Sequence, residues 1–324
     1  MLRVRGIFTL VSFVVCAAAT PAALAAAQPL VWHDPGDVSK LDFGGDVGTG
    51  IPAPKPPFRF LKEDGSGTQP KILVEDANHR TWDVKFGNEV RTECFAWRIP
   101  AAVGYFVEPS YYVASGQIAG LGTLNRKTPS IGAQGQFREG RFQIRDAARW
   151  DYIEGRTWTW KRNPFAGTPE LKGLEILIML ASNWDNKDGS AGPGEANVGM
   201  FRRTANGREQ LLYSFTDWGS GMGAWGDKTG QTDWRCKDYA AQTPQFVKGV
   251  ANGYVVFGYE GHMRDGFQTG IRPSDVAWLM KYLGQLTDAQ LRAGIRAAGG
   301  SASDETCFTA AIRARIEQLR RAAR

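Results

Sequence analysis

Alternating apolar and polar positions predict two short strands in the first third of the chain. Residues 71–75 alternate, residues 76–78 have the composition of a turn, and residues 81–86 run back as a second strand. Apolar side chains then recur at roughly helical spacing through residues 88–102, where Pro100 is expected to shorten the helix. The pattern therefore predicts a β-hairpin followed directly by a helix.

A strongly apolar helix of about fourteen residues is predicted after Thr168. Thr168 is a good N-cap, Pro169 suits the first helical position, and Glu170 favours the positive end of the helix dipole. Apolar residues on most faces of this helix indicate that it is buried. Two further strands are predicted at residues 198–202 and 211–215.

The C-terminal fifty residues have helical periodicity and N-cap signals. Ser274 is expected to cap a helix over residues 275–284, and Thr287 with Gln290 forms the capping-box pattern. A final helix is predicted over residues 304–322.

Strands early in the chain and helices late predict an α+β fold. We expect it to be bilobal, with a strand-rich N-lobe at residues 59–125 and a mostly helical C-lobe at residues 126–324. Residues 28–58 are rich in Gly, Pro and Asp without a sustained period, which predicts an extended N-terminal arm.

The first 27 residues have the pattern of a cleavable signal peptide. Arg3 and Arg5 form a short basic region, an apolar run follows, and small residues then fit cleavage near Ala26 or Gln28. An uncleaved membrane anchor is the alternative, but the apolar run is shorter than the ~20 residues that a spanning helix needs. The sequence therefore predicts an exported protein, periplasmic or secreted, without stable membrane insertion.

The formal net charge of the chain is +6, and loss of Arg3 and Arg5 with the signal leaves +4. Much of this excess lies in the last helix, where no aromatic side chains alternate with the arginines. A solvated basic helix face is the simpler interpretation, so we expect no nucleic-acid partner.

Three cysteines remain after the signal. Cys94 falls inside an apolar helical pattern, so Cys236 and Cys307 are the expected disulfide, worth ~4 kcal/mol in the chain-entropy model. The chain has no Cys-x-x-Cys motif and its three histidines are scattered, which argues against a structural zinc site.

Five polar residues stand where the predicted elements meet, and they match the needs of phosphoryl transfer. A lysine neutralises nucleotide phosphates, a helix glutamate fixes that lysine, an aspartate receives the proton of the acceptor hydroxyl, and an asparagine and a second aspartate hold Mg²⁺. In that order the candidates are Lys85, Glu93, Asp185, Asn197 and Asp217. The first three are the catalytic candidates and the last two the metal ligands.

A glycine-rich turn at residues 64–68 precedes the hairpin. Such a turn can bring backbone N–H groups close to phosphate oxygens without a side-chain clash. The candidate nucleotide-binding residues are therefore Gly65, Ser66, Gly67, Lys71 and Lys85.

These motifs resemble the atypical branches of the protein-kinase-like superfamily. The resemblance rests on Trp82-Asp83-Val84-Lys85-Phe86-Gly87, on the helix from Glu93 to Ile99, on Asn183-Trp184-Asp185 and on Asp217-Trp218-Gly219, which is similar to the Asp-Phe-Gly metal motif. It is nearest to HipA-like kinases and to exported bacterial proteins with the same two tryptophan motifs. The resemblance implies a bilobal kinase-like fold that binds ATP and Mg²⁺ between its lobes, with Glu93 rather than Glu89 as the partner of Lys85.

Two features depart from the family pattern. The family places its asparagine about five residues after the catalytic aspartate, whereas Asp185 and Asn197 are twelve residues apart. Residues 189–194 have the composition of a loop insertion that leaves Asn197 at the metal, although Asp188 is an alternative ligand. Export is the second departure, because nucleoside triphosphate is scarce outside the cytoplasm.

Three functions follow as hypotheses. The first is a kinase-like phosphotransferase acting on a protein, a small molecule or a glycan. The second is an exported pseudokinase that serves as a nucleotide- or protein-binding module. The third is a Trp-rich protein that binds glycan or envelope polymer, although most of the tryptophans are expected in the core.

Overall fold

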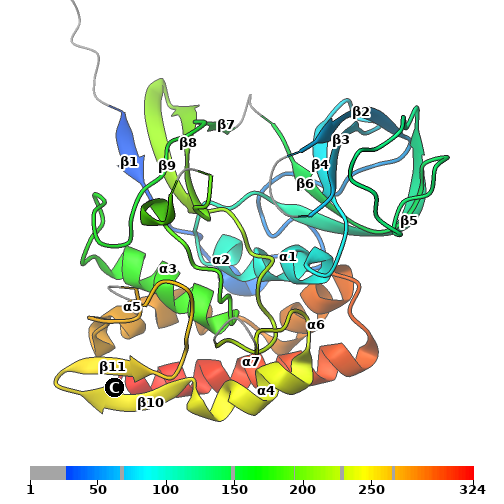
Figure 1. The fold of residues 1–324 in the computed structure, drawn as a ribbon. Helices are drawn as coiled ribbons and strands as arrows, with labels where there is room; N and C mark the ends of the chain where they lie inside the picture. Colours follow the sequence, from blue (N-terminus) through cyan, green and yellow to red (C-terminus); the bar gives the residue numbers. More distant parts are fainter. Residues whose placement is uncertain (1–26, 66–68, 147–149, 193, 227–229, 265–266) are drawn as a thin grey trace, which may run out of the picture.

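The computed structural model describes residues 27–65, 69–146, 150–192, 194–226, 230–264 and 267–324. The predicted signal peptide lies outside the described residues, apart from residue 27. The architecture is mixed α+β, as the sequence pattern predicts. Helices gather on one side of the molecule and a barrel of strands lies on the other, with two short helices between them (Figure 1).

Five strands close into a barrel in the order β2-β3-β4-β6-β5. They are β2 (Phe58–Asp64), β3 (Lys71–Glu75), β4 (Thr81–Lys85), β5 (Ser110–Ala119) and β6 (Gln136–Ile144). The barrel is filled by apolar side chains that are almost fully buried, including Phe58, Val74, Trp82, Val84 and Phe142. The predicted hairpin is confirmed, since β3 pairs antiparallel with β4 with Lys71 opposite Lys85.

The barrel crosses the expected domain boundary at residue 125. β6 lies beyond it, yet β6 pairs with β4 on one side and with β5 on the other, so it belongs to the barrel. The physical reason is edge closure: without β6 both neighbouring strands would expose unpaired backbone groups. The strand-rich part therefore extends to Ile144. The part beyond it is also less helical than expected, because it contains β7 to β11.

The helix predicted over residues 88–102 is present as two short helices, α1 (Val90–Ala96) and α2 (Arg98–Ala102). They meet at Trp97, whose indole N–H donates a hydrogen bond to the carbonyl of Ser110, 2.6 Å away. Pro100 is the third residue of α2, within the first turn, where a missing backbone N–H breaks no helical hydrogen bond. The proline thus shapes the helix pair without removing it.

A second sheet is built around the hairpin of β8 (Val198–Ala205) and β9 (Arg208–Phe215), with the strand order β1-β9-β8-β7. β7 (Asp151–Tyr152) pairs with β8, and β1 (Gln28–Leu30) adds a parallel edge to β9. The two strands predicted at the positions of β8 and β9 are therefore confirmed, and each is longer than predicted.

The region predicted as an extended arm is largely irregular beyond β1, with one short turn, η1 (Val38–Lys40). Five of its apolar side chains nevertheless belong to the core, because each is at most 6% exposed: Val31, Val38, Phe43, Val47 and Ile51.

The helical side contains α3 (Pro169–Leu180), α4 (Cys236–Gln242), α5 (Pro273–Leu283), α6 (Asp288–Ala297) and α7 (Ala302–Ala322). Short elements η2 (Gly189–Ala191), η3 (Thr243–Gln245), β10 (Val247–Ala251) and β11 (Tyr254–Phe257) complete it. α3 is buried along almost its whole length, as its apolar pattern predicts. α7 packs against α4, α5 and α6, and so holds the helices together.

The N-caps follow the sequence in two of three places. Thr168 accepts a hydrogen bond from the N–H of Leu171, and Thr287 with Gln290 forms a capping box. Ser274 is not the cap of α5, which begins at Pro273. Proline fits the first helical position because that position needs no N–H donor, so the cap moves back to the preceding residue.

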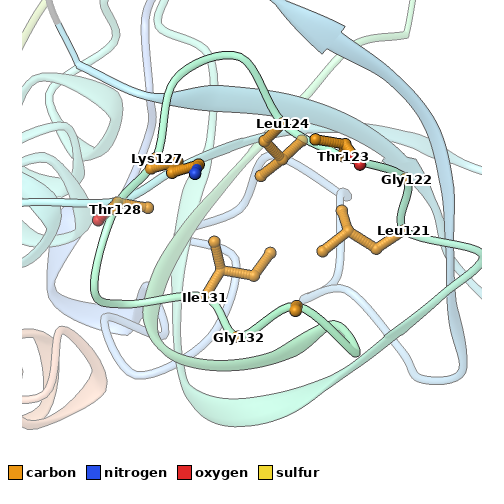
Figure 2. Close-up of a pocket in the computed structure, with 9 residues that line it drawn as sticks. Leu121, Gly122, Thr123, Leu124, Lys127, Thr128, Ile131 and Gly132 are labelled. Atoms are coloured by element: carbon orange, nitrogen blue, oxygen red, sulfur yellow. The ribbon is translucent and has the colours of Figure 1, made fainter.

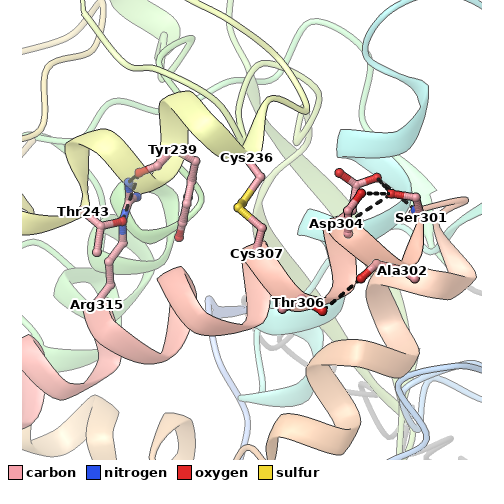
Figure 3. Close-up of a disulfide and its surroundings, with 10 residues drawn as sticks. Cys236, Tyr239, Thr243, Ser301, Ala302, Asp304, Thr306, Cys307 and Arg315 are labelled. Atoms are coloured by element: carbon pink, nitrogen blue, oxygen red, sulfur yellow. Dashed lines mark hydrogen bonds between the residues drawn. A yellow bond between two sulfur atoms is a disulfide. The ribbon is translucent and has the colours of Figure 1, made fainter.

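The disulfide expected between Cys236 and Cys307 is present and joins α4 to α7 (Figure 3). Cys94 is free and fully buried in α1. Within the described part of the chain, no helix has both the length and the apolar character that crossing a bilayer requires.

Candidate active site

Lys85 lies at the end of β4, on the face that points away from the barrel interior. Its neighbours Trp82 and Val84 fill the barrel, so strand alternation turns Lys85 outward toward α1. The lysine is nevertheless buried, because α1 covers it: the ammonium lies 2.8 Å from a carboxylate oxygen of Glu89 and also contacts Glu93. The ion pair expected between Lys85 and Glu93 therefore forms, and Glu89 is a second partner.

Electrostatics keep this lysine charged. Burial alone lowers the pKa of an ammonium group, but here the facing carboxylates of Glu93 and Asp217 outweigh burial and raise the pKa of Lys85 above its ordinary value. For Glu89 the balance is reversed: burial exceeds the attraction of Lys85, so the pKa of Glu89 is raised.

Arg141 on β6 holds the other side of Glu93. Its Nε atom lies 2.6 Å from the second carboxylate oxygen of Glu93, and its guanidinium is also 3.4 Å from Asp83. Arg141 is opposite Lys85 in the strand register, so two cations from adjacent strands hold one helix carboxylate. Both arginine and glutamate are buried, which makes this contact a fixed part of the site.

Asp217 follows β9 and completes a group of three carboxylates. Oxygen atoms of Glu89, Glu93 and Asp217 all lie within 4.8 Å of one another. Burial alone raises the pKa of Asp217, but Lys85 and the N–H of Gly219, which donates to Asp217 at 2.9 Å, more than offset it. The pKa of Asp217 is therefore lowered, and the carboxylate is charged at neutral pH.

Gly219, the last residue of the Asp-Trp-Gly motif, lies close to two of the carboxylates. A Cβ atom at this position would come within 2.8 Å of a carboxylate oxygen of Glu93 and 3.0 Å of Asp217. Any larger residue would thus push apart the carboxylates that surround Lys85.

The loop that carries Asp185 is joined to the segment that carries Asp217. Buried Asn183 donates from its side chain to the carbonyl of Asp217 at 2.9 Å, and its side-chain oxygen accepts from the N–H of Asp185. The N–H of Trp184 also donates to the carbonyl of Ser220 at 3.0 Å. The two aspartates therefore lie on adjoining, hydrogen-bonded segments.

The side chain of Asp185 has its own partners. One carboxylate oxygen lies 3.3 Å from the ammonium of Lys187 and 3.1 Å from Nδ1 of His262. Asn197, although twelve residues away in sequence, returns to this loop and donates from its side chain to the carbonyl of Asp185 at 2.6 Å. This leaves its side-chain oxygen as a candidate metal ligand.

Both carboxylate oxygens of Asp188 are engaged by backbone groups. One of its oxygens accepts from the N–H of Ser190 at 2.9 Å, and the other accepts from the N–H of Trp160 at 2.8 Å. The structure therefore favours a loop-stabilising role for Asp188, and its alternative role as a metal ligand stays a prediction.

The candidate nucleotide-binding residues are placed in part. Ser66 and Gly67 lie outside the described residues, and Gly65 stands at the end of β2, where the turn to β3 begins. Lys71 starts β3 with its ammonium 3.6 Å from Asp64, and its charge also contributes to the field at Asp217. Lys71 and Lys85 are thus neighbouring cations on the same face of the barrel.

A cavity of about 590 Å³ lies away from these residues, in the loop between β5 and β6 (Figure 2). Its walls include Leu121, Leu124, Lys127 and Ile131, and none of the predicted site residues. This cavity is separate in sequence and in lining from the charged group around Lys85.

Sequence reasoning missed three residues of the site, Arg141, Lys187 and His262, and it placed Glu89 second to Glu93 as the partner of Lys85. The Asp-x-Lys spacing is a usable signal for Lys187, whereas Arg141 stands in a strand with several other polar residues and offers none. His262 offers no such signal, because it reaches Asp185 from 77 residues away through contacts such as the hydrogen bond from its N–H to the carbonyl of Trp184.

Comparison of the chain with protein-family models, curated proteins and solved structures finds no match.

Proposed function

We propose that this protein is an exported, kinase-like phosphotransferase with ATP and Mg²⁺ bound between a barrel N-lobe and a helical C-lobe. The observation that carries the proposal is the buried ion pair of Lys85 and Glu93 with Asp217 beside it. A lysine that stays charged while surrounded by carboxylates suits the neutralisation of phosphate oxygens, and few purely structural roles require that arrangement.

The chemistry of the donor set fits Mg²⁺, which prefers carboxylate and carbonyl oxygens. Asp217 and the side-chain oxygen of Asn197 are the proposed ligands, and the bound ion offsets the charge that develops on the transferred phosphoryl group. In this proposal Asp185 receives the proton of the acceptor hydroxyl. At the same time the hydroxyl oxygen bonds to the γ-phosphorus, and the bond between that phosphorus and ADP breaks. Lys187, 3.3 Å from Asp185, holds that carboxylate in place.

The test is nucleotide-dependent stabilisation. Thermal unfolding of the mature protein is measured with and without millimolar ATP and Mg²⁺, and the unfolding midpoint is expected to rise. Ligand at about 100 times its dissociation constant adds roughly 2.7 kcal/mol to the free energy of unfolding. Lys85→Ala and Asp217→Ala are expected to abolish the shift.

The control variant is Lys127→Ala, which alters the separate cavity of Figure 2 and is expected to retain the full shift. Asp217→Asn, which preserves volume, guards against loss of folding, and the circular dichroism spectrum of each variant is recorded without nucleotide. If the wild-type protein shows no shift at millimolar nucleotide, the proposal is wrong.

One observation favours a second candidate, the pseudokinase that binds nucleotide without transferring phosphate. The same oxygen of Asp185 contacts both Lys187 and His262, so this carboxylate is already engaged. Incubation with γ-labelled ATP separates the two functions: label on any acceptor, including the protein itself, excludes the pseudokinase. The Trp-rich glycan platform lacks support, since all eleven tryptophans are buried or half-buried.

A further inference from the structure

A second cavity, of about 540 Å³, lies against the charged group of the candidate active site. One wall is the turn before α1 and its first residues, and the other is the segment of residues 231–235 that leads into α4. This volume is within the range of small-molecule sites in proteins. Its polar lining residues include Asn88, Arg91, Glu139, Gln231, Asp233 and Arg235.

Asp233 connects this cavity to the site. It lines the cavity, and its carboxyl group also interacts with the carboxylates of Glu89 and Asp217. Burial, followed by Glu89, raises the pKa of Asp233 to about 7. The cavity and the three-carboxylate group are therefore adjacent, and a molecule in the cavity would lie beside the residues proposed to bind the phosphates.

The wall that carries Asp233 is held in place by backbone hydrogen bonds. The N–H groups of Thr232, Trp234 and Arg235 donate to the carbonyls of Ala224, Gly221 and Met222 respectively. The two chain segments joined by these hydrogen bonds approach so closely that a Cβ atom on Gly223 would lie 2.0 Å from the carbonyl oxygen of Thr232. The wall is thus preformed, which lowers the entropic cost of binding.

The lining selects the chemistry of the ligand. The charged residues are balanced in pairs, since Arg91 contacts Glu139 and Arg235 lies 3.2 Å from Asp238. Asp233 differs, because its carboxyl group faces the Trp184 side chain and the Gly221 backbone, while its buried Oδ1 atom makes no hydrogen bond of ordinary geometry among the residues that the structure describes. The remaining lining residues are Gly87, Asn88, Val90, Gln231, Thr232 and Trp234, three of which carry a neutral amide or hydroxyl group. A surface of this kind suits a neutral ligand with many hydroxyl groups more than an apolar or a strongly charged one.

We propose that this cavity binds the phosphate acceptor, and that the acceptor is a neutral polyhydroxyl compound of the sugar class, with one hydroxyl donating to Asp233. Its role as acceptor rests on the proposed phosphotransferase function. Binding of the sugar itself depends only on the cavity.

The probes are maltotriose and chitotriose. Their binding is measured by saturation-transfer NMR on the mature protein without nucleotide. Both are expected to give signals at millimolar concentration. Asp233→Ala is expected to weaken binding about tenfold, the effect of losing one hydrogen bond to a charged group. Asn88→Trp, which fills the cavity from an exposed position, is expected to abolish it. Lys127→Ala, in the cavity of Figure 2, is expected to change nothing.

Nucleotide shifts measured on the same samples separate this inference from the proposed function. A nucleotide shift without a sugar signal overturns the inference alone, as does a sugar signal that Asp233→Ala and Asn88→Trp leave unchanged. A sugar signal without any nucleotide shift supports the binding site and overturns the phosphotransferase. Binding of a serine-containing peptide in place of both sugars also overturns the inference.

Discussion

Glu175 shows how burial sets the pH response of a single residue. It lies on α3 with no exposed surface, one oxygen 2.8 Å from the ammonium of Lys172 and the other without a hydrogen-bond partner in the described part of the chain. Burial, only partly offset by Lys172, raises the pKa of Glu175 to about 8. The unfolded chain ionises this carboxyl near pH 4.5, whereas the folded chain keeps it protonated up to about pH 8.

The direction in which pH changes the stability follows from the number of protons bound by the folded and unfolded states. Between these two pH values the folded state binds more protons than the unfolded state, so stability falls as pH rises and the loss is complete above about pH 8. We expect Glu175 alone to account for a decrease on the order of 4 kcal/mol in the free energy of unfolding. Glu175→Gln removes the titrating group and should flatten this part of the pH profile.

Urea unfolding at pH 5, 6, 7 and 8 checks this prediction. The slopes of wild-type protein and Glu175→Gln are compared, because the slope is insensitive to any constant cost of the substitution. Glu154→Gln, at an exposed carboxyl, is the matched control and should run parallel to wild type. Parallel curves for Glu175→Gln as well would contradict the assignment.

At the residue scale, proximity in sequence decides what can be predicted. Lys85 and Glu93 are eight residues apart, on a strand and the helix directly after it, so their pairing follows from local structure. Arg141 reaches Glu93, and His262 reaches Asp185, from remote segments. No local pattern encodes those contacts, because they depend on strand order and loop packing.

At the element scale, α2 fixes the N-terminal arm through one arginine. Arg98 is 1% exposed, and its guanidinium donates to the carbonyls of Phe43 at 2.8 Å and Gly45 at 2.7 Å. Arg98→Leu leaves these carbonyls without a buried donor. We expect the free energy of unfolding to fall by on the order of 3 kcal/mol and the arm to be cleaved earlier by protease.

Urea unfolding and limited proteolysis with mass spectrometry measure the two effects. Arg264→Leu is the control, because among the described residues Arg264 forms only an exposed ion pair with Glu260, and its removal should cost less than about 1 kcal/mol. If residues 28–51 are cut no faster in Arg98→Leu than in this control, the arm does not depend on Arg98.

Elements with strong local signals were predictable, and those defined by distant pairing were not. The β3–β4 hairpin, α3 and the capping box of α6 follow from alternation, apolar periodicity and cap residues. β6 did not fall within the expected N-lobe because its membership depends on closing a barrel with strands more than fifty residues away. The arm had no period to detect, yet its apolar side chains are buried through tertiary contacts.

At the scale of the whole molecule, the sequence predicted the α+β plan and the covalent cross-link. The cross-link joins residues that are 71 positions apart, and it begins at Cys236, directly after the wall segment of residues 231–235. Figure 3 shows that α4 and α7 also meet through Arg315, which donates to the side chain of Thr243 and to the carbonyl of Tyr239. Non-covalent contacts therefore hold the same two helices together in the native state.

Reduction of this disulfide should consequently act mainly on the unfolded chain. Closing a loop of this length is worth about 4 kcal/mol in the chain-entropy model, so reduced protein and Cys236→Ser/Cys307→Ser should lose about that much free energy of unfolding. Because Arg315 still joins α4 to α7, the affinity for maltotriose should stay unchanged in both. Reductant added to the double variant is the control and should have no effect. Loss of affinity together with stability would show instead that the cross-link shapes the native wall beside Asp233.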